Sequence, residues 1–234
     1  MSDLSAAFWQ ALQLITQADP ALTEIVVLSF QVSGVALALG ALLGLPSGVW
    51  LGLSRFRGQR LLIALIYTGM GLPPVVVGLI VYLLLSRQGP LGFLQWLFTP
   101  SAMILAQALI AAPLIAGFAM AAMMGIDPEL RQQLRSLGAT RWQVSLALMR
   151  EARVGIVVAL VAGFGGIISE VGAVMLVGGN IEGATRVLTT AIVLETRQGR
   201  FDHALALGLI LLTLTLVINL AVLALDGRGA QARR

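Results

Sequence analysis

The chain has 234 residues, 58% of them apolar, with a mean hydropathy of +0.94 and a formal net charge of +4. A water-soluble domain of this length would need more polar surface, so the composition indicates an integral membrane protein. The absence of cysteine and the single histidine, His203, argue against disulfides and thiolate or multi-histidine metal sites, and the absence of lysine excludes a G-x-x-x-x-G-K phosphate loop.

Residues 1–20 precede the first apolar stretch and contain no basic residue. Leu4, Phe8, Leu12 and Ile15 fall on one helical face, which predicts a short extracytoplasmic or interfacial helix rather than a signal peptide. A frayed terminus that packs against nothing is the alternative.

Five apolar stretches follow, each long enough to cross about 30 Å of hydrocarbon as a helix. We therefore predict an all-α integral membrane fold, with one transmembrane domain over 1–234 and a five-span core over 24–225. The predicted spans are 24–52, 61–85, 101–125, 154–178 and 204–225.

Two of these spans carry small or helix-breaking residues. In the first, Gly40, Gly44, Gly48 and Gly52 recur every four residues, which predicts a ridge that lets another helix come close. Glycine is also simply common in membrane helices. In the second, Pro73-Pro74 removes two backbone donors and predicts a kink, which either lines a transport pathway or is purely structural.

The arginines set the expected orientation, because cytoplasmic loops of membrane proteins are enriched in basic residues. With the N-terminus outside and the C-terminus inside, eleven arginines face the cytoplasm and four face outward. The inner set is Arg55, Arg57, Arg60, Arg131, Arg135, Arg141, Arg150, Arg153, Arg228, Arg233 and Arg234, and the outer set is Arg87, Arg186, Arg197 and Arg200.

The inner connection 126–153 has strong helix-boundary signals. Asp127 and Pro128 predict a helix start, and Gly138 predicts a left-handed C-terminal cap. Thr140 and Gln143 form a capping-box pattern that predicts a second helix immediately afterwards.

The first of these short helices is amphipathic. Leu130, Leu134 and Leu137 are expected to form one apolar face, and Glu129 lies in the first turn, where a negative charge is favourable. A helix of about ten residues is marginal alone in water, so this face needs a partner, either the membrane surface or another protein.

This segment, ELRQQLRSLGATRW, resembles the cytoplasmic coupling region of permease subunits of ABC importers. In that family an E-A-A triplet precedes a glycine by three residues and is followed by I-x-L-P. Here the glycine is Gly138, Gln132-Gln133-Leu134 replaces the triplet, and Leu148-Met149-Arg150-Glu151 replaces the final motif.

The stretch ISEVGAVMLVGGNIEGATRVLTTAIVLE, over 168–195, is similar to permeases for tetrahedral oxyanions. Sulfate and molybdate types usually carry T-L-P-x-A-I after N-I-x-G-x-T-R. This chain reads Val187-Leu188-Thr189-Thr190-Ala191-Ile192, closer to the tungstate type.

The resemblance implies a permease of a bacterial or archaeal cytoplasmic membrane that has no cofactor and no catalytic activity of its own. ATP would be bound by two copies of a cytosolic ABC ATPase, and the other partners would be an extracytoplasmic oxyanion-binding protein, a second copy of the permease and the lipid bilayer, with no nucleic acid. The ATPase-coupling residues implied are Glu129, Leu130, Leu134, Leu137 and Gly138.

Glu170 is the only acid deep inside a predicted span, and Ser169 precedes it. A carboxylate repels an anion, so we expect Glu170 to hold a gate or to accept backbone donors at a Gly163–Gly166 bend; a neutral, protonated Glu170 that donates a hydrogen bond is the alternative. In the outer connection, Asn180 and Arg186 are candidates for docking the binding protein, although such residues are often plain turn or interfacial residues.

Other classes of protein fit less well. A secondary transporter would need coupling-ion carboxylates or an internal repeat, and an intramembrane enzyme would need a Ser/His pair, paired aspartates or a metal site within the spans. His203 lies at the outer edge of the fifth span with no evident catalytic partner in the sequence.

Overall fold

The structure, a computed structural model, describes residues 9, 13 and 20–231, with side chains as far as Leu220. The residues that predicted an interfacial helix, Leu4, Phe8, Leu12 and Ile15, lie outside this part of the chain. Every regular element in the described residues is helical: α2 (Pro20–Leu53), α3 (Gln59–Met70), α4 (Pro74–Leu85), η1 (Gly92–Leu94), α5 (Pro100–Met124), α6 (Pro128–Ser136), α7 (Arg141–Glu151), α8 (Arg153–Ile168), α9 (Gly172–Gly178), α10 (Leu188–Arg197) and α11 (Phe201–Gln231).

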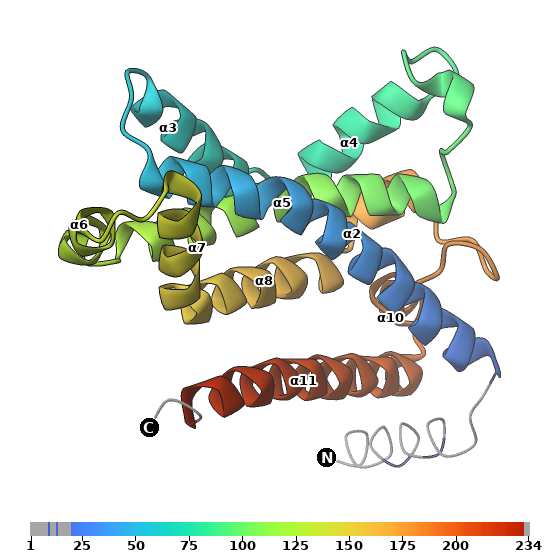
Figure 1. The fold of residues 1–234 in the computed structure, drawn as a ribbon. Coiled ribbons are helices and arrows are strands. Elements are labelled where there is room, and N and C mark those ends of the chain that lie inside the picture. The colour runs from blue at the N-terminus through green and yellow to red at the C-terminus, as the bar shows by residue number, and fades with distance from the viewer. Residues whose placement is uncertain (1–8, 10–12, 14–19, 232–234) are drawn as a thin grey trace.

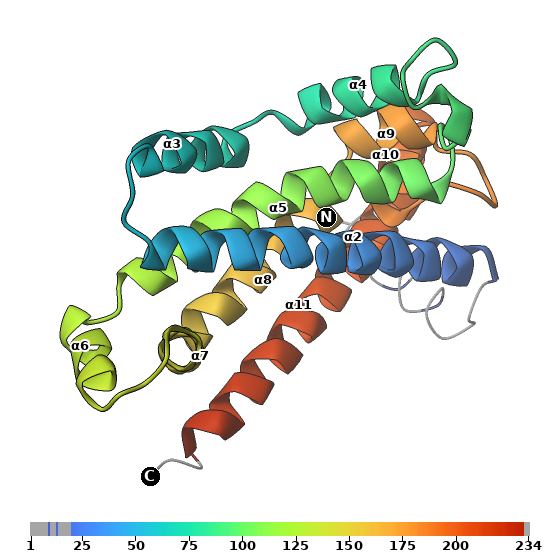
Figure 2. The same cartoon turned by 45° about the horizontal axis from the view of Figure 1, so that its top comes forward.

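Helices α2 and α5 lie side by side through the middle of the molecule (Figures 1 and 2). The glycine ridge of α2 makes this contact possible, as the sequence predicts. A Cβ atom at Gly40 would lie 2.8 Å from the Cβ of Ala111, and one at Gly44 would lie 2.6 Å from the carbonyl oxygen of Ala112. The two backbones therefore approach at a distance that only glycine permits.

The number of membrane-spanning segments agrees with the expected five when broken helices are counted as single spans, but the fourth then covers Arg141–Ile168 in place of 154–178. Helices α2, α5 and the Phe201–Leu220 part of α11 are each long and apolar enough to cross a membrane. The number rises to five if the bent pairs α3–α4, at 95°, and α7–α8, at 69°, each count as one span. The proline pair does more than kink the second span, because α3 ends at Met70 and α4 begins at Pro74.

The fourth predicted span, 154–178, is not continuous. Helix α8 runs without interruption through Gly163–Gly166, so the bend expected at those glycines is absent; the chain breaks instead after Ile168, and α9 begins at Gly172. The predicted spans leave 179–203 as a connection, whereas the structure forms α10 within it. Sequence periodicity did not indicate this helix because it is only ten residues long and is stabilised by packing against α11 and against α2, which lies far away in the sequence.

Three apolar clusters among the described residues hold the helices together. The largest joins α2, α4, α5, α8 and α9, a second joins the start of α2 to α10 and α11, and a third joins the end of α2 and α5 to α6 and α7. Figure 1 shows α3 and α4 rising as two arms on one side and α11 lying on the other. Helices α6 and α7 are thus fixed to one end of the bundle.

Candidate functional site

Helix α6 has the boundaries that its sequence predicts. The Asp127 carboxylate accepts a hydrogen bond from the backbone N–H of Glu129 at 2.9 Å. At the other end Gly138 has φ +81°, and the Ala139 N–H donates to the Leu134 carbonyl at 3.1 Å. This pattern satisfies carbonyls that a helix end would leave unpaired.

Helix α7 starts immediately afterwards with the predicted capping box. The backbone N–H of Thr140 donates to the Gln143 side chain at 2.8 Å, and the Gln143 N–H donates to the Thr140 hydroxyl at 3.3 Å. Two well-capped helices therefore follow one another with only Leu137–Thr140 between them.

The three leucines of α6 do not form the single free face expected from their spacing. Leu130 and Leu134 are half-buried against the third cluster, beside Val144 and Leu148 of α7. Leu137 is 84% exposed. The difference arises because Leu137 is the C-cap residue, where the helix ends and the side chain leaves the line of the first two.

Arg131 attaches α6 to α2. Its guanidinium donates to the Leu53 carbonyl at 2.8 Å, at the last residue of α2. Burial lowers the pKa of Arg131, and the neighbouring positive charges of Arg135 and Arg55 lower it further. Three arginines from two segments are therefore gathered where α2 ends and α6 begins.

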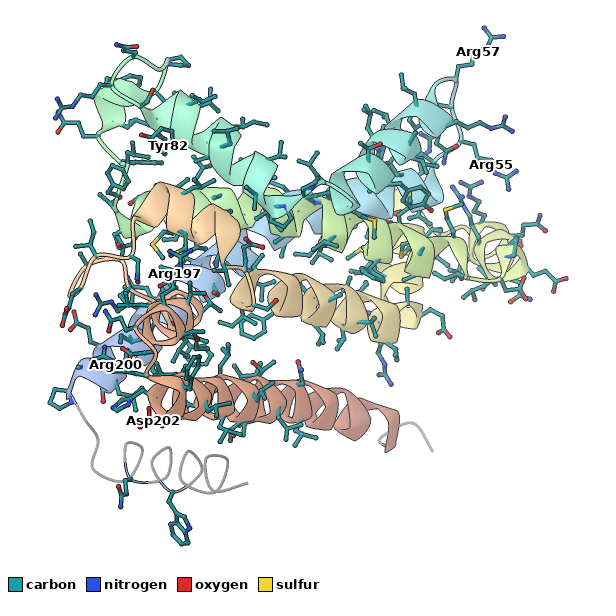
Figure 3. All side chains as sticks on the ribbon, turned by 180° about the vertical axis from the view of Figure 1, so that it is seen from behind. Arg55, Arg57, Tyr82, Arg197, Arg200 and Asp202 are labelled. Carbon is teal, nitrogen blue, oxygen red and sulfur yellow. The ribbon has the colours of Figure 1, made fainter. Side chains whose placement is uncertain are left out.

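Four arginines assigned to opposite sides of the membrane, two to each side, lie at opposite ends of the molecule. Figure 3 places Arg55 and Arg57, from the connection between α2 and α3, far from Arg197 and Arg200, which flank the turn between α10 and α11. Arg200 forms an ion pair with Glu195 at 2.6 Å. This separation agrees with the alternation of the predicted spans.

The four pathway candidates come from two helix breaks that lie next to each other. Pro73 and Pro74 line a cavity of about 300 Å³ together with Gly166 of α8. On the other side of the second break, a Cβ atom at Gly172 would lie 2.5 Å from a methyl carbon of Val75. The break at 71–73 therefore faces the break at 169–171, a pairing that no pattern in the sequence indicates.

Glu170 has a structural role in its break. One carboxylate oxygen accepts a hydrogen bond from the backbone N–H of Ala173 at 2.9 Å, at the start of α9. The Glu170 carbonyl accepts from the Thr189 hydroxyl at 3.0 Å, which ties α10 to the same point. Glu170 thus accepts a backbone donor as expected, but at α9 and not at Gly163–Gly166. Ser169 is exposed, and its hydroxyl donates back to the Gly165 carbonyl at 2.8 Å.

Helices α4 and α9, which follow the two breaks, are packed closely together. A Cβ atom at Gly78 would lie 2.6 Å from the Cα of Ala173. Both Gly78 and Ala173 are buried. The two half-helices therefore behave as one pair, held by backbone contact.

Two other polar residues of the spans serve as links between helices. The Gln107 side chain donates to the Ile167 carbonyl at 2.9 Å and so holds α5 to the end of α8. The Ser29 hydroxyl accepts from the backbone N–H of Leu188 at 2.9 Å, at the start of α10. These are interhelical hydrogen bonds, the ordinary use of polar groups in membrane spans.

At the opposite end, the candidate docking residues lie in the turn between α9 and α10. Gly179 and Asn180 have φ +75° and +53°. Arg186 is half-buried and forms an ion pair with Glu182 at 3.2 Å. The Thr185 hydroxyl fixes this turn by donating to the Gly178 carbonyl at 2.6 Å.

Comparison with known proteins finds transport proteins both by family and by individual relatives. Residues 44–230 match the family described as "Binding-protein-dependent transport system inner membrane component". The chain is 41% identical to the tungstate uptake system permease protein TupB of Peptoclostridium acidaminophilum over 97% of this chain and 99% of that protein. It is 46% identical to a probable anion ABC transporter permease protein of Haloferax volcanii over 85% and 88% of the two chains.

The fold is also known. A chain in the crystal structure of a bacterial ABC transporter that imports the acidic polysaccharide alginate superimposes with a TM-score of 0.73 at 23% identity, covering 96% of this chain and 87% of that one. At this identity the likeness establishes the fold.

Proposed function

Since the chain belongs to the family of binding-protein-dependent transport system inner membrane components, we propose that it is the membrane-spanning permease through which an ATP-driven importer moves tungstate inward. The observation that carries the choice of anion is the 41% identity to a tungstate permease along almost the whole of both chains. The sequence Thr189-Thr190, in place of a proline-containing segment, agrees with it.

Helix α6 is the surface that receives the ATPase in this proposal. It is short, capped at both ends and carried on the arginine-rich end of the bundle. Leu137, 84% exposed, supplies an apolar anchor for a groove in the partner, and Glu129 and Gly138 bound the docking surface. Leu130 and Leu134 instead connect that surface to the rest of the permease.

Movement of α6 would reach the helix breaks through α7 and α8. Leu130 and Leu134 pack on α7, which joins α8 at a 69° bend. Helix α8 has 16 residues and is about 24 Å long at 1.5 Å per residue, and it ends at the break that contains Glu170. A rigid helix between a bend and a break transmits rotation from one end to the other.

The break region is the gate in this mechanism. The Glu170 carboxylate lies where α4 and α9 meet, and its negative charge disfavours an anion while the gate is closed. The predicted spans contain no arginine, so the conduit offers the anion only weak sites. Affinity then comes from an extracytoplasmic binding protein, which docks at the end of the molecule that carries Asn180 and Arg186.

The complete importer in this proposal contains two copies of the permease and two ATPases. The N-terminus lies outside and the C-terminus inside, because this orientation places eleven of fifteen arginines in the cytoplasm. Residues 126–153 then form the cytoplasmic coupling region.

The experiment is uptake of tungsten, molybdenum and sulfur by cells that express the permease with its cognate ATPase and binding protein. We expect tungsten uptake at nanomolar supply, and its loss in Gly138→Val, which strains the left-handed cap of α6. Molybdenum or sulfur uptake in place of tungsten would retain the mechanism and reject the anion. An assembled, ATP-hydrolysing complex that takes up none of the three would reject the substrate class.

A further inference from the structure

A large cavity opens where α2, α6 and α7 meet. Its volume is about 820 Å³, within the range of small-molecule and cofactor sites. The two long walls come from the last turns of α2 and from α7, and α6 closes one end. The transport mechanism above does not use this cavity.

The rim of the cavity is strongly basic. Arg55, Arg131, Arg135 and Arg141 line it, and no acidic residue does. Within the described part of the chain none of the four forms an ion pair. Arg131 uses one nitrogen on the Leu53 carbonyl, and its Nε is buried with no hydrogen-bond partner among the described residues. The rim therefore presents guanidinium groups that no acidic residue of the lining neutralises, which favours an anionic ligand.

The inner part of the cavity is apolar and lies along the last turns of the first predicted span, 24–52. The lining on α2 extends from Leu45 to Leu53, about 12 Å along the helix at 1.5 Å per residue. Each interfacial layer of a bilayer is roughly 5–8 Å thick, so the cavity reaches from the headgroup region into the hydrocarbon. A soluble oxyanion would occupy only the rim and leave the apolar part uncovered.

Aromatic residues mark the boundary between the two parts. Trp50 lies against Phe56 with ring centroids 4.9 Å apart, and Trp142 is 75% exposed on the opposite wall. Tryptophan is enriched at the depth of lipid headgroups, where one end of the ring is apolar and the other wet. The cavity therefore has a cationic rim, an aromatic boundary and an apolar interior in the order that a phospholipid requires.

We propose that this cavity binds an anionic phospholipid, with the headgroup phosphate among Arg55, Arg131, Arg135 and Arg141 and the acyl chains against Leu45, Pro46 and Val49. Basic pockets between membrane helices suit such headgroups, and arginine binds phosphate through two parallel hydrogen bonds. Because Arg131 also holds α6 to α2, the bound lipid would stabilise the position of α6.

The test compares Arg55→Gln/Arg141→Gln with Arg57→Gln/Arg60→Gln. Both double variants remove two exposed positive charges and avoid α6, but Arg57 and Arg60 do not line the cavity. Figure 3 shows Arg57 extending from the tip of the connection between α2 and α3, away from the helices. Binding of dioleoylphosphatidylglycerol and of dioleoylphosphatidylcholine to the purified full chain would be measured by native mass spectrometry.

We expect the wild type and the Arg57/Arg60 variant to prefer phosphatidylglycerol over phosphatidylcholine, and the Arg55/Arg141 variant to bind it about 25-fold more weakly, from roughly fivefold per arginine. Equal binding of both lipids by the wild type, or equal losses in the two variants, overturns the proposal. If the Arg55/Arg141 variant does not fold, Arg55→Gln alone replaces it, with an expected loss of about fivefold, and no loss overturns the proposal.

Two further measurements distinguish the lipid from a free anion and from the protein partner. Binding of inorganic phosphate that is lost in Arg55→Gln/Arg141→Gln, without a preference for phosphatidylglycerol, would assign the site to a free anion and reject the lipid. Loss of ATPase co-purification in that variant, with lipid binding unchanged, would assign the arginines to the protein partner and reject the lipid as well.

Discussion

The carboxylate of Glu170 accepts a hydrogen bond from the backbone N–H of Ala173 at 2.9 Å, so the deepest acid of the spans caps the half-helix that follows its own break. This position suits two roles, a cap for α9 and a charge at the gate. They are separable, because glutamine keeps the acceptor and loses the charge.

Glu170→Gln should therefore leave the melting temperature of the purified permease almost unchanged and alter the rate of anion uptake. Glu170→Ala should lower the free energy of unfolding by about 1 kcal/mol, the usual cost of a lost cap. Thermal melting followed by tryptophan fluorescence and cellular uptake are the two measurements. Uptake kinetics identical to wild type in Glu170→Gln would leave capping as the sole function.

Gly138 permits a second paired test. Nothing lies within 4 Å of a Cβ atom at this position, so any effect of a small side chain comes from the φ of +81°. Gly138→Ala should cost about 1–2 kcal/mol in local strain, whereas Gly138→Asn should cost less because asparagine tolerates the left-handed region. We expect ATPase co-purification to fall in the order wild type, Gly138→Asn, Gly138→Ala. The reverse order would show that strain at the cap does not control docking.

Leu137 is exposed whereas Leu134 packs against α7, so the same substitution at the two positions should affect different properties, ATPase association at Leu137 and stability at Leu134. Leu137→Ser should change the stability of the isolated permease by less than about 0.5 kcal/mol and weaken its association with the ATPase. Leu134→Ser should destabilise the permease itself by about 1–2 kcal/mol, because it removes apolar contact with α7. Melting temperature and co-purification should be measured for both. Leu137→Ser with full ATPase association would contradict the docking surface.

The α2–α5 contact predicts a strong position effect among the glycines of α2. Gly44→Ala would place a Cβ 2.6 Å from the Ala112 carbonyl oxygen, which forces the helices apart at a cost of about 1–3 kcal/mol. Gly34→Ala is the control, because no atom lies within 4 Å of its Cβ and alanine favours helix by up to about 1 kcal/mol. Melting of both variants in detergent tests the contact; equal melting temperatures would argue against it.

The link between α2 and α10 can be tested with two serines of one helix. Ser29→Ala removes the acceptor of the buried Leu188 N–H and should cost about 1–3 kcal/mol. Ser47→Ala should be nearly neutral, since its hydroxyl donates only to carbonyls of its own helix, including Leu43 at 2.7 Å. Hydrogen exchange at the first turn of α10 should rise in Ser29→Ala alone. Unchanged exchange there would show that other contacts hold α10 in place.

The sequence by itself determined what depends on near neighbours. The caps at Asp127, Gly138 and Thr140 each involve residues no more than about five positions apart, and the structure has all three. Hydropathy likewise located the apolar stretches, and the four-residue repeat of glycine identified the ridge on α2. The resemblance of 127–142 to a coupling region led to the family that the comparisons establish.

Only the tertiary structure decided how distant segments meet. The break after Ile168 is tied to α10 by the Thr189 hydroxyl, which donates to the Glu170 carbonyl across 19 positions of the sequence, and the arginine-rimmed cavity joins residues from three separate helices and the connection after α2. Leu130 and Leu134 turned inward because α7 folds back over them, which their spacing could not show. The physical reason is that caps and hydropathy are set by short-range hydrogen bonds and solvation, whereas breaks, cavities and burial depend on which helices pack together.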